Sequence, residues 1–204
     1  MTHSTRTSGA RSGQATIFLD RDGTINEDVG YLNAIDRLVF IPGALDAIRL
    51  LTRAGYQIVI ITNQAGVGLG MIDEGVLGEL HRTIDERIAQ AGGRVDGWFI
   101  CPHHVTATIE KFRIDCDCRK PKPGLFDQAC KALPIDKSRS FYIGDKASDM
   151  AAARAAGLPG ILVRTGYGDG EFQRLNGRVP GAALVVANLP EAVSRILRNE
   201  VPRA

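Results

Sequence analysis

The chain has 204 residues, of which 44% are hydrophobic and 24% are charged, and this composition is ordinary for a globular protein in water. Its length suits one well-filled domain, and no apolar run approaches the roughly 20 residues that a membrane-spanning helix needs. The formal net charge is +2 and the Lys and Arg residues are scattered along the chain, so we expect no nucleic-acid partner and no membrane.

Residues 1–14 are small and polar and lack the apolar segment of a secretory signal, so they predict a disordered leader before a single domain over residues 15–204. Within that domain, short apolar runs alternate with helical stretches, which is the pattern of a parallel sheet covered by crossover helices. The runs predict strands over residues 15–20, 56–62, 97–102, 140–145 and 160–166, and more weakly over 182–187. The other stretches predict helices over residues 42–55, 72–93, 124–133, 146–157 and 189–199. We therefore expect the α/β class.

The ends of these strands carry the candidate functional residues. In open parallel sheets the ligand site lies beyond the carboxyl ends of the strands, and this rule selects Asp20, Thr62, Cys101 and Asp145. Asp20 is followed closely by Asp22, and two carboxylates this near to each other resist burial unless a cation or a chemical task accounts for them.

The pair Asp20 and Asp22 suits phosphoryl transfer, because one carboxylate can attack phosphorus while the second protonates the leaving oxygen. By itself, Asp-x-Asp is more often an ordinary turn. The chain also supplies a hydroxyl at the end of the second strand, cations in a Pro-rich loop over residues 119–124, and Gly-Asp at the end of the fourth strand. These are the further parts that phosphoryl transfer with Mg²⁺ requires.

Four segments carry a family resemblance: FLDRDGT, ITN, RKPKPG and GDKASD follow one another between Thr16 and about Thr165. In this order they resemble the four motifs of the haloacid dehalogenase (HAD) superfamily of phosphatases. Within it, DRDGTIN, DVGY, TNQAG and the CPHH…CDCRKPKPG segment are most similar to the heptose bisphosphatase family, with the histidinol-phosphate phosphatases as close relatives. The resemblance implies a Rossmann-like parallel sheet. One helix and one strand fill the interval between the first two motifs, so we expect no large cap domain.

The resemblance also implies roles for the site residues. Asp20 becomes the nucleophile and Asp22 the acid that protonates the leaving alcohol and then activates water. Mg²⁺ is bound by the Asp20 carboxylate, the Asp22 backbone carbonyl and Asp145, although Asp145 has the alternative role of a helix N-cap. Asp149 is expected to make a supporting hydrogen bond rather than a metal contact. Thr62 and Lys120 hold the transferring phosphoryl oxygens, and Arg119, which precedes Lys120, is counted with the catalytic residues.

A cluster of cysteine and histidine lies in the long connection over residues 101–124, which we call the zinc loop. Cys101 and His103, followed by Cys116 and Cys118, supply three thiolates and one imidazole, a closed and therefore structural Zn²⁺ sphere. His104 is the alternative to His103, and the family pattern selects His103. Cys130, on a predicted helix, is expected to be a small buried hydrophobe. Because Arg119 and Lys120 follow directly, zinc would position catalytic cations.

Substrate recognition requires anion partners and hydroxyl partners. Arg119 can bind a phosphate bidentately and Lys146 can act as a point charge, although Arg119 could equally be a salt-bridged loop residue and Asp28 a turn residue. By resemblance, the sugar is lined by two short stretches: Asp28, Val29, Gly30 and Tyr31, and then Thr62, Asn63, Gln64 and Ala65. The segment GYGDGEFQRLNGRVPG after Thr165 is expected to be a loop that either closes over the site or only connects elements.

The function implied by the resemblance is removal of the C7 phosphate from a heptose 1,7-bisphosphate through an aspartyl-phosphate, for the synthesis of nucleotide-activated heptose for cell-surface glycans. The clustered cysteines fit a reducing, cytoplasmic setting, and we expect a monomer. The alternative enzyme is a phosphatase for histidinol phosphate or another small phosphomonoester. A non-catalytic zinc-stapled binding module is disfavoured by the complete catalytic set, and a polynucleotide-end phosphatase by the lack of a basic groove.

Overall fold

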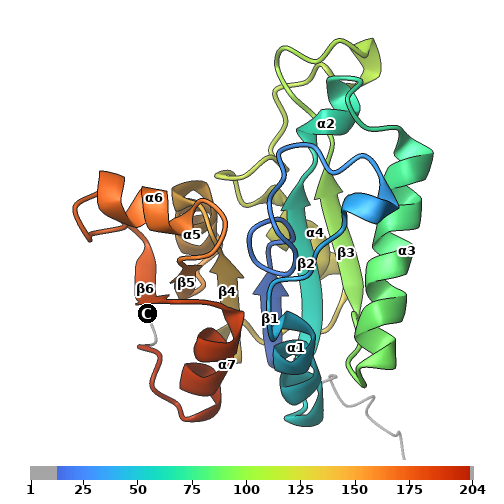
Figure 1. Ribbon diagram of the computed structural model, residues 1–204. Helices are drawn as coiled ribbons and strands as arrows, with labels where there is room; N and C mark the ends of the chain where they lie inside the picture. The colour runs from blue at the N-terminus through green and yellow to red at the C-terminus, as the bar shows by residue number, and fades with distance from the viewer. Residues whose placement is uncertain (1–12, 203–204) are drawn as a thin grey trace, which may run out of the picture.

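A computed structural model describes residues 13–202 and has one parallel sheet at its centre (Figure 1). The strands are β1 (Thr16–Leu19), β2 (Gln57–Asn63), β3 (Gly97–Cys101), β4 (Phe141–Gly144), β5 (Gly160–Val163) and β6 (Ala182–Val186). Their order across the sheet is β3-β2-β1-β4-β5-β6, and every neighbouring pair is parallel. All six predicted strands are confirmed. The strand before Asp20, β1, lies between β2, which contains Thr62, and β4, which ends just before Asp145.

The register of β1 aligns these strand ends. Leu19 pairs with Ile60 of β2 on one side and with Ile143 of β4 on the other. The backbone N–H of Asp20 donates to the carbonyl of Ile143 at 2.9 Å, which fixes the residue at the tip of the strand. Functional residues of three strands therefore emerge at one edge of the sheet.

Helices cover both faces of the sheet. One face carries α1 (Ala44–Arg53), α3 (Glu74–Gln90) and α7 (Leu189–Leu197), and the other carries α4 (Gly124–Ala132) and α5 (Ala147–Ala155). The shorter elements are α2 (Ala65–Gly68), α6 (Gly168–Arg174) and the 3₁₀ turns η1 (Ile35–Arg37), η2 (Glu110–Phe112) and η3 (Lys137–Arg139). The five predicted helices are confirmed, and side-chain caps explain where two of them begin: Asp73 accepts from backbone N–H groups of α3, and Asn188 does so for α7.

The core follows the alternation of the strands. Ile17 and Leu19 point to the layer of α1, α3 and α7, whereas Phe18 points to α4 and α5 and packs edge-on against Phe126. Both faces of β1 are fully buried. A strand buried on both faces reads as a continuous apolar run, and this is why the central strand was recognisable in the sequence.

The segment after Thr165 corrects the prediction of a loop, because it contains α6. Several glycines in GYGDGEFQ weaken the local helix signal. Packing supplies what the sequence lacks, since Phe172 packs on the cluster of Met150 and Leu162, and the Arg164 guanidinium lies over its ring. The start of this segment contacts the candidate site, as described below.

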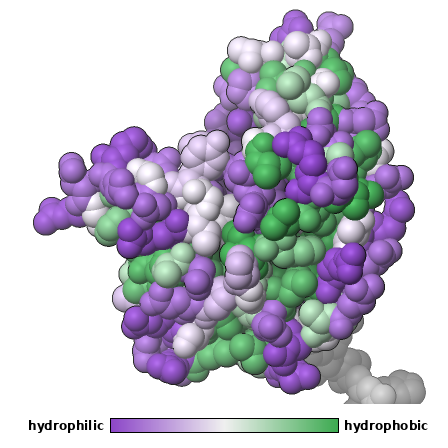
Figure 2. All heavy atoms as spheres, in the orientation of Figure 1, coloured by the Kyte–Doolittle hydropathy of each residue, from purple (hydrophilic) through white to green (hydrophobic). Residues whose placement is uncertain are grey.

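The surface differs between the flanks and the middle of the view in Figure 2. Hydrophilic residues cover the outer sides of α3 and α6, and apolar residues reach the surface between them. Within the described part of the chain, no helix combines the length and apolar character needed to cross a membrane. The predicted leader lies outside the described residues as far as residue 12, and Gln14 forms a parallel bridge with Ile135.

Candidate active site

The carboxyl ends of β1, β2 and β4 open into a cavity of about 310 Å³. Its lining is formed by polar and charged residues from the strand ends, the zinc loop and the start of α5: Asp20, Asp22, Thr62, Asn63, Arg119, Lys120, Lys146, Ser148 and Asp149. The structure thus brings together all five residues predicted to be catalytic: Asp20, Asp22, Thr62, Arg119 and Lys120. Ser148 was missed by the sequence analysis, although its position between Lys146 and Asp149 was a usable signal.

Lys120 is the buried cation of this cavity. Its Nζ lies 2.9 Å from Asp20 Oδ1 and 2.7 Å from Asp149 Oδ1, and it donates to the Tyr142 hydroxyl at 2.8 Å. Burial lowers the pKa of the amine, but the charges of Asp149 and Asp20 outweigh burial and raise it. Lys120 therefore stays positively charged beside the candidate nucleophile, where negative charge develops during phosphoryl transfer.

Asp20 and Asp145 form the candidate cation site. Carboxylate oxygens of Asp20, Asp145 and Asp149 lie within 4.8 Å of one another. Asp149 is already engaged, because its oxygens accept hydrogen bonds from the Tyr142 hydroxyl and the Lys146 backbone as well as pairing with Lys120. This agrees with its expected supporting role.

Asp145 is fully buried, and its Oδ1 has no hydrogen-bond partner among the described residues, while Oδ2 accepts from the Tyr167 backbone at 2.8 Å. Burial, followed by the charges of Asp20 and Asp149, raises the pKa of Asp145 to about 8. A buried, unpartnered carboxylate oxygen beside a second carboxylate fits Mg²⁺, which favours one or two carboxylates plus substrate oxygens. The N-cap of α5 is Lys146, so the alternative role of Asp145 as N-cap is not realised.

Asp22 is held by a set of donors. Arg21 Nη2 approaches its two carboxylate oxygens at 2.8 and 2.6 Å, while Asn26 Nδ2 and Gln64 Nε2 each donate at 2.9 Å. Burial raises the pKa of Asp22, but Arg21 and the hydrogen bonds outweigh burial and hold it below its usual range. Gln64 also donates to the Thr62 hydroxyl at 3.0 Å, so one amide orients two candidate catalytic groups.

The zinc loop gathers its four predicted ligand atoms. Five of the distances between these atoms run from 3.1 to 3.9 Å. Four ligand atoms arranged as a tetrahedron about 2.3 Å from Zn²⁺ would lie about 3.8 Å from one another, which is similar. The four residues are Cys101, His103, Cys116 and Cys118. A disulfide requires about 2.05 Å, and all cysteines in the described chain are free. The donor set and its spacing therefore fit zinc.

The structure separates the two histidine alternatives. His103 Nδ1 faces the cluster, whereas His104 Nδ1 lies 2.8 Å from Thr106 Oγ1 and is absent from it. Arg119 Nη1 donates to the carbonyl of His103 at 3.2 Å, which connects the cluster to the catalytic cavity.

The candidate substrate-binding residues lie in several environments. Lys146 lines the cavity, pairs with Asp28 at 2.9 Å and lies over the Tyr167 ring, so its charge is shared with the carboxylate of Asp28. Asn63 bonds the backbone of Lys120 through its amide oxygen and nitrogen and thereby holds this part of the zinc loop. Tyr31 is exposed at the same end of the molecule, next to the residues that begin α2. The remaining predicted residues lie on the loop before η1 and around the start of α2: Val29, Gly30, Gln64 and Ala65.

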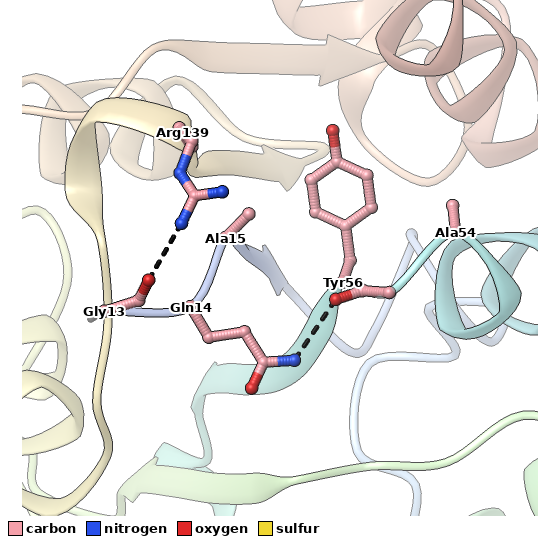
Figure 3. A pocket seen from close by; sticks show the side chains of 7 residues that line it. Gly13, Gln14, Ala15, Ala54, Tyr56 and Arg139 are labelled. Atoms are coloured by element: carbon pink, nitrogen blue, oxygen red, sulfur yellow. Dashed lines mark hydrogen bonds between the residues drawn. The ribbon is translucent and has the colours of Figure 1, made fainter. Parts of the chain in front are cut away.

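A larger cavity, of about 510 Å³, lies at the opposite end of β1 (Figure 3). Gln14 donates to the carbonyl of Gly55 there, and Arg139 is committed to the Gly13 carbonyl and to Asp136. Among the residues that the structure describes, its lining contains no carboxylate, and its one hydroxyl belongs to Tyr56. The chemistry therefore belongs to the smaller cavity.

The fold and the site define a hydrolase of the haloacid dehalogenase type, and comparisons with known proteins agree. The profile of the HAD-hydrolase-like family matches residues 117–192. A protein from Photorhabdus laumondii named D-glycero-beta-D-manno-heptose-1,7-bisphosphate 7-phosphatase is 42% identical over 189 residues, covering 90% of this chain and 97% of that protein. One of the same name from Rhodopseudomonas palustris is 48% identical over 144 residues, covering 71% of this chain and 80% of that protein.

Solved structures give the same result. The D,D-heptose 1,7-bisphosphate phosphatase from B. bronchiseptica, crystallised with magnesium and phosphate, superposes with a TM-score of 0.82 at 33% identity, over 91% of this chain and 99% of that chain. A putative HAD-like phosphatase from Mesorhizobium loti has a TM-score of 0.78 at 30% identity, over 97% of this chain and 93% of that chain. This chain therefore belongs to the D-glycero-beta-D-manno-heptose-1,7-bisphosphate 7-phosphatase family.

Proposed function

We propose that this protein removes the C7 phosphate of D-glycero-β-D-manno-heptose 1,7-bisphosphate. The observation that carries the chemistry is the pairing of Asp20 with Lys120 at 2.9 Å inside a cavity, beside the unpartnered oxygen of Asp145. The names and identities of the relatives support this substrate. The reaction belongs to the supply of a heptose 1-phosphate for activation by a nucleotide.

In the first step an Asp20 carboxylate oxygen attacks phosphorus, and the bond between phosphorus and the C7 oxygen breaks. The leaving oxygen takes a proton from Asp22, which gives the free alcohol and an aspartyl-phosphate. Lys120 and Thr62 bind oxygens of the phosphoryl group as it moves. Arrival of the negatively charged phosphate opposes the effect of Arg21 on the pKa of Asp22, which favours the protonated form that this step requires.

In the second step water attacks the same phosphorus and Asp22 accepts a proton from that water. The bond between phosphorus and Asp20 breaks, inorganic phosphate leaves, and both carboxylates return to their starting states. Bound Mg²⁺, held by Asp20, the Asp22 backbone carbonyl and Asp145, would supply positive charge that offsets repulsion between carboxylates and phosphate.

The zinc loop serves positioning rather than chemistry. Zn²⁺ bound by Cys101, His103, Cys116 and Cys118 would have no open position for substrate. It would fix the loop that delivers Arg119 and Lys120, and Arg119 is the candidate partner for the second phosphate because its guanidinium lines the cavity. The sugar bisphosphate is the proposed small-molecule partner, and the monomeric state and cytoplasmic location remain proposals from the sequence.

The test is phosphate release with saturating Mg²⁺, comparing the heptose bisphosphate with histidinol phosphate and using Asp20→Asn as the blank. We expect kcat/KM to favour the bisphosphate by about a hundredfold or more, which corresponds to about 2.7 kcal/mol of additional transition-state binding. A preference for histidinol phosphate would retain the chemistry and overturn the substrate assignment.

A further inference from the structure

Arg21 is a buried cation that the proposed mechanism leaves without a direct role. Its side chain is 1% exposed, and in the sequence it stands between the nucleophile Asp20 and the acid/base Asp22. Its Nε and Nη2 atoms donate to the Asp22 carboxylate at 2.6–3.0 Å. A guanidinium is a planar fork, so its orientation fixes the plane and position of the carboxylate that it binds.

The remaining nitrogen of the guanidinium, Nη1, contacts a side chain of helix α3. Arg21 Nη1 lies 3.2 Å from Nε2 of His81, a residue on α3 that is distant in sequence. Since an arginine can only donate, Nε2 must accept, and His81 must be a neutral imidazole with its proton on Nδ1. Burial, together with the charge of Arg21, lowers the pKa of His81 to about 3, in agreement with a neutral ring.

His81 is itself fixed by the edge strand β3. Its ring stacks on Trp98 with centroids 4.1 Å apart and an interplanar angle of 20°. The Trp98 indole N–H donates to Asp85 Oδ1, one turn along α3, at 2.9 Å. The indole is therefore locked at both its face and its N–H, and the histidine can rotate little against it.

We infer that His81, braced by Trp98, is a positioning residue for the acid/base: it orients Arg21, and Arg21 holds the Asp22 carboxylate in line with the leaving oxygen. This inference rests on the proposed function, because it requires Asp22 to be the acid/base. Without an acceptor at the position of His81 Nε2, the buried Nη1 group has to find another partner, and the guanidinium turns away from its fork with Asp22.

Leaving-group dependence distinguishes positioning of Asp22 from a general packing role. An alkyl phosphate needs a proton on its leaving oxygen, whereas p-nitrophenyl phosphate releases p-nitrophenolate, which is a stable anion without a proton from the enzyme. Because kcat/KM covers the steps through cleavage of the ester, only the alkyl substrate reports on the acid. A packing defect would lower kcat/KM for both substrates alike.

The experiment compares kcat/KM for the heptose bisphosphate and for p-nitrophenyl phosphate in the wild type, His81→Phe and His81→Gln. Phe keeps a ring against Trp98 but accepts no hydrogen bond, and Gln offers a carbonyl oxygen at the distance of Nε2. We expect His81→Phe to lose about 10- to 100-fold on the alkyl substrate and less than about threefold on the aryl substrate, and His81→Gln to recover most of the loss.

Equal losses on both substrates, or wild-type values for His81→Phe, would overturn the inference. Should His81→Phe fail to fold, Trp98→Ala replaces it, since Trp98 is only partly buried at the edge of the sheet, and the same selective or equal loss decides the question. If the wild type cleaves p-nitrophenyl phosphate and histidinol phosphate but not the heptose bisphosphate, the proposed function fails. The role of His81 is then decided with histidinol phosphate as the alkyl substrate.

Discussion

The closeness of Gly23 to Asp145 leads to a prediction with a matched control. Gly23 has φ +78°, and a Cβ built on it lies 2.1 Å from Asp145 Oδ2. Gly157 has a similar φ of +73°, and no atom of another described residue beyond its chain neighbours lies within 4 Å of its Cβ position. In Gly157→Ala only backbone strain acts, so we expect a loss of about 1–2 kcal/mol in the free energy of unfolding and unchanged catalysis.

In Gly23→Ala the same strain is joined by displacement of Asp145. Ordinary contact begins at 3.4 Å, so the carboxylate oxygen has to move by 3.4 − 2.1 = 1.3 Å. A misplacement of about 1 Å costs about a hundredfold in rate, and we expect that loss in kcat/KM together with a higher Mg²⁺ concentration for half-maximal activity.

The assay combines urea unfolding with phosphate release over a Mg²⁺ titration for the wild type, Gly23→Ala and Gly157→Ala. Catalysis by Gly23→Ala within about threefold of Gly157→Ala, at the same Mg²⁺ requirement, would refute the assignment of Asp145 to the cation site.

Three further predictions follow from the site. Asp20→Asn should abolish phosphate release and leave the circular dichroism melt intact, and substantial turnover would remove Asp20 from the nucleophile role. Cys116→Ser should lower zinc, measured by elemental analysis, from near one equivalent and lower the Tm, whereas full activity without zinc would contradict a positioning role. Because the pKa of Asp145 is raised from 3.8 to about 8, stability of the metal-free wild type should decline as pH rises between these values. In urea unfolding, the free energy of unfolding of Asp145→Asn should therefore rise relative to that of the wild type as pH rises over that range. A difference between the two proteins that does not change with pH would argue that Asp145 is not an isolated buried charge.

Much of the fold was predictable because buried strands leave continuous β-branched runs, as in QIVIITN of β2, and because α3 shows its apolar residues at helical spacing. The helix α6 was missed because its stability comes from contacts of Phe172 with distant residues rather than from helix propensity. Such contacts are invisible to a local pattern.

The acidic and basic residues of the cavity were predictable from motifs at strand ends, but their partners were not. Nothing local in the sequence connects Arg21 with His81, because the contact depends on how α3 packs across the sheet. Ser148 differs from this case, since its position between Lys146 and Asp149 was a local signal that it lines the cavity. Only the path of the backbone through the zinc loop decides which of the adjacent residues His103 and His104 faces the cysteine cluster.

The central position of β1 between β2 and β4 has a consequence for folding of the enzyme during its synthesis on the ribosome. Lys120 and Asp149 must join Asp20 from far along the chain, and Asp149 follows β4, the strand that pairs with β1. Contacts of such long sequence separation form late, because closure of the intervening chain opposes them. A nascent chain that ends before β4 therefore has its nucleophile but no catalytic cavity. Phosphatase activity should therefore appear only after β4 has paired with β1, which makes turnover a direct report of that step of folding.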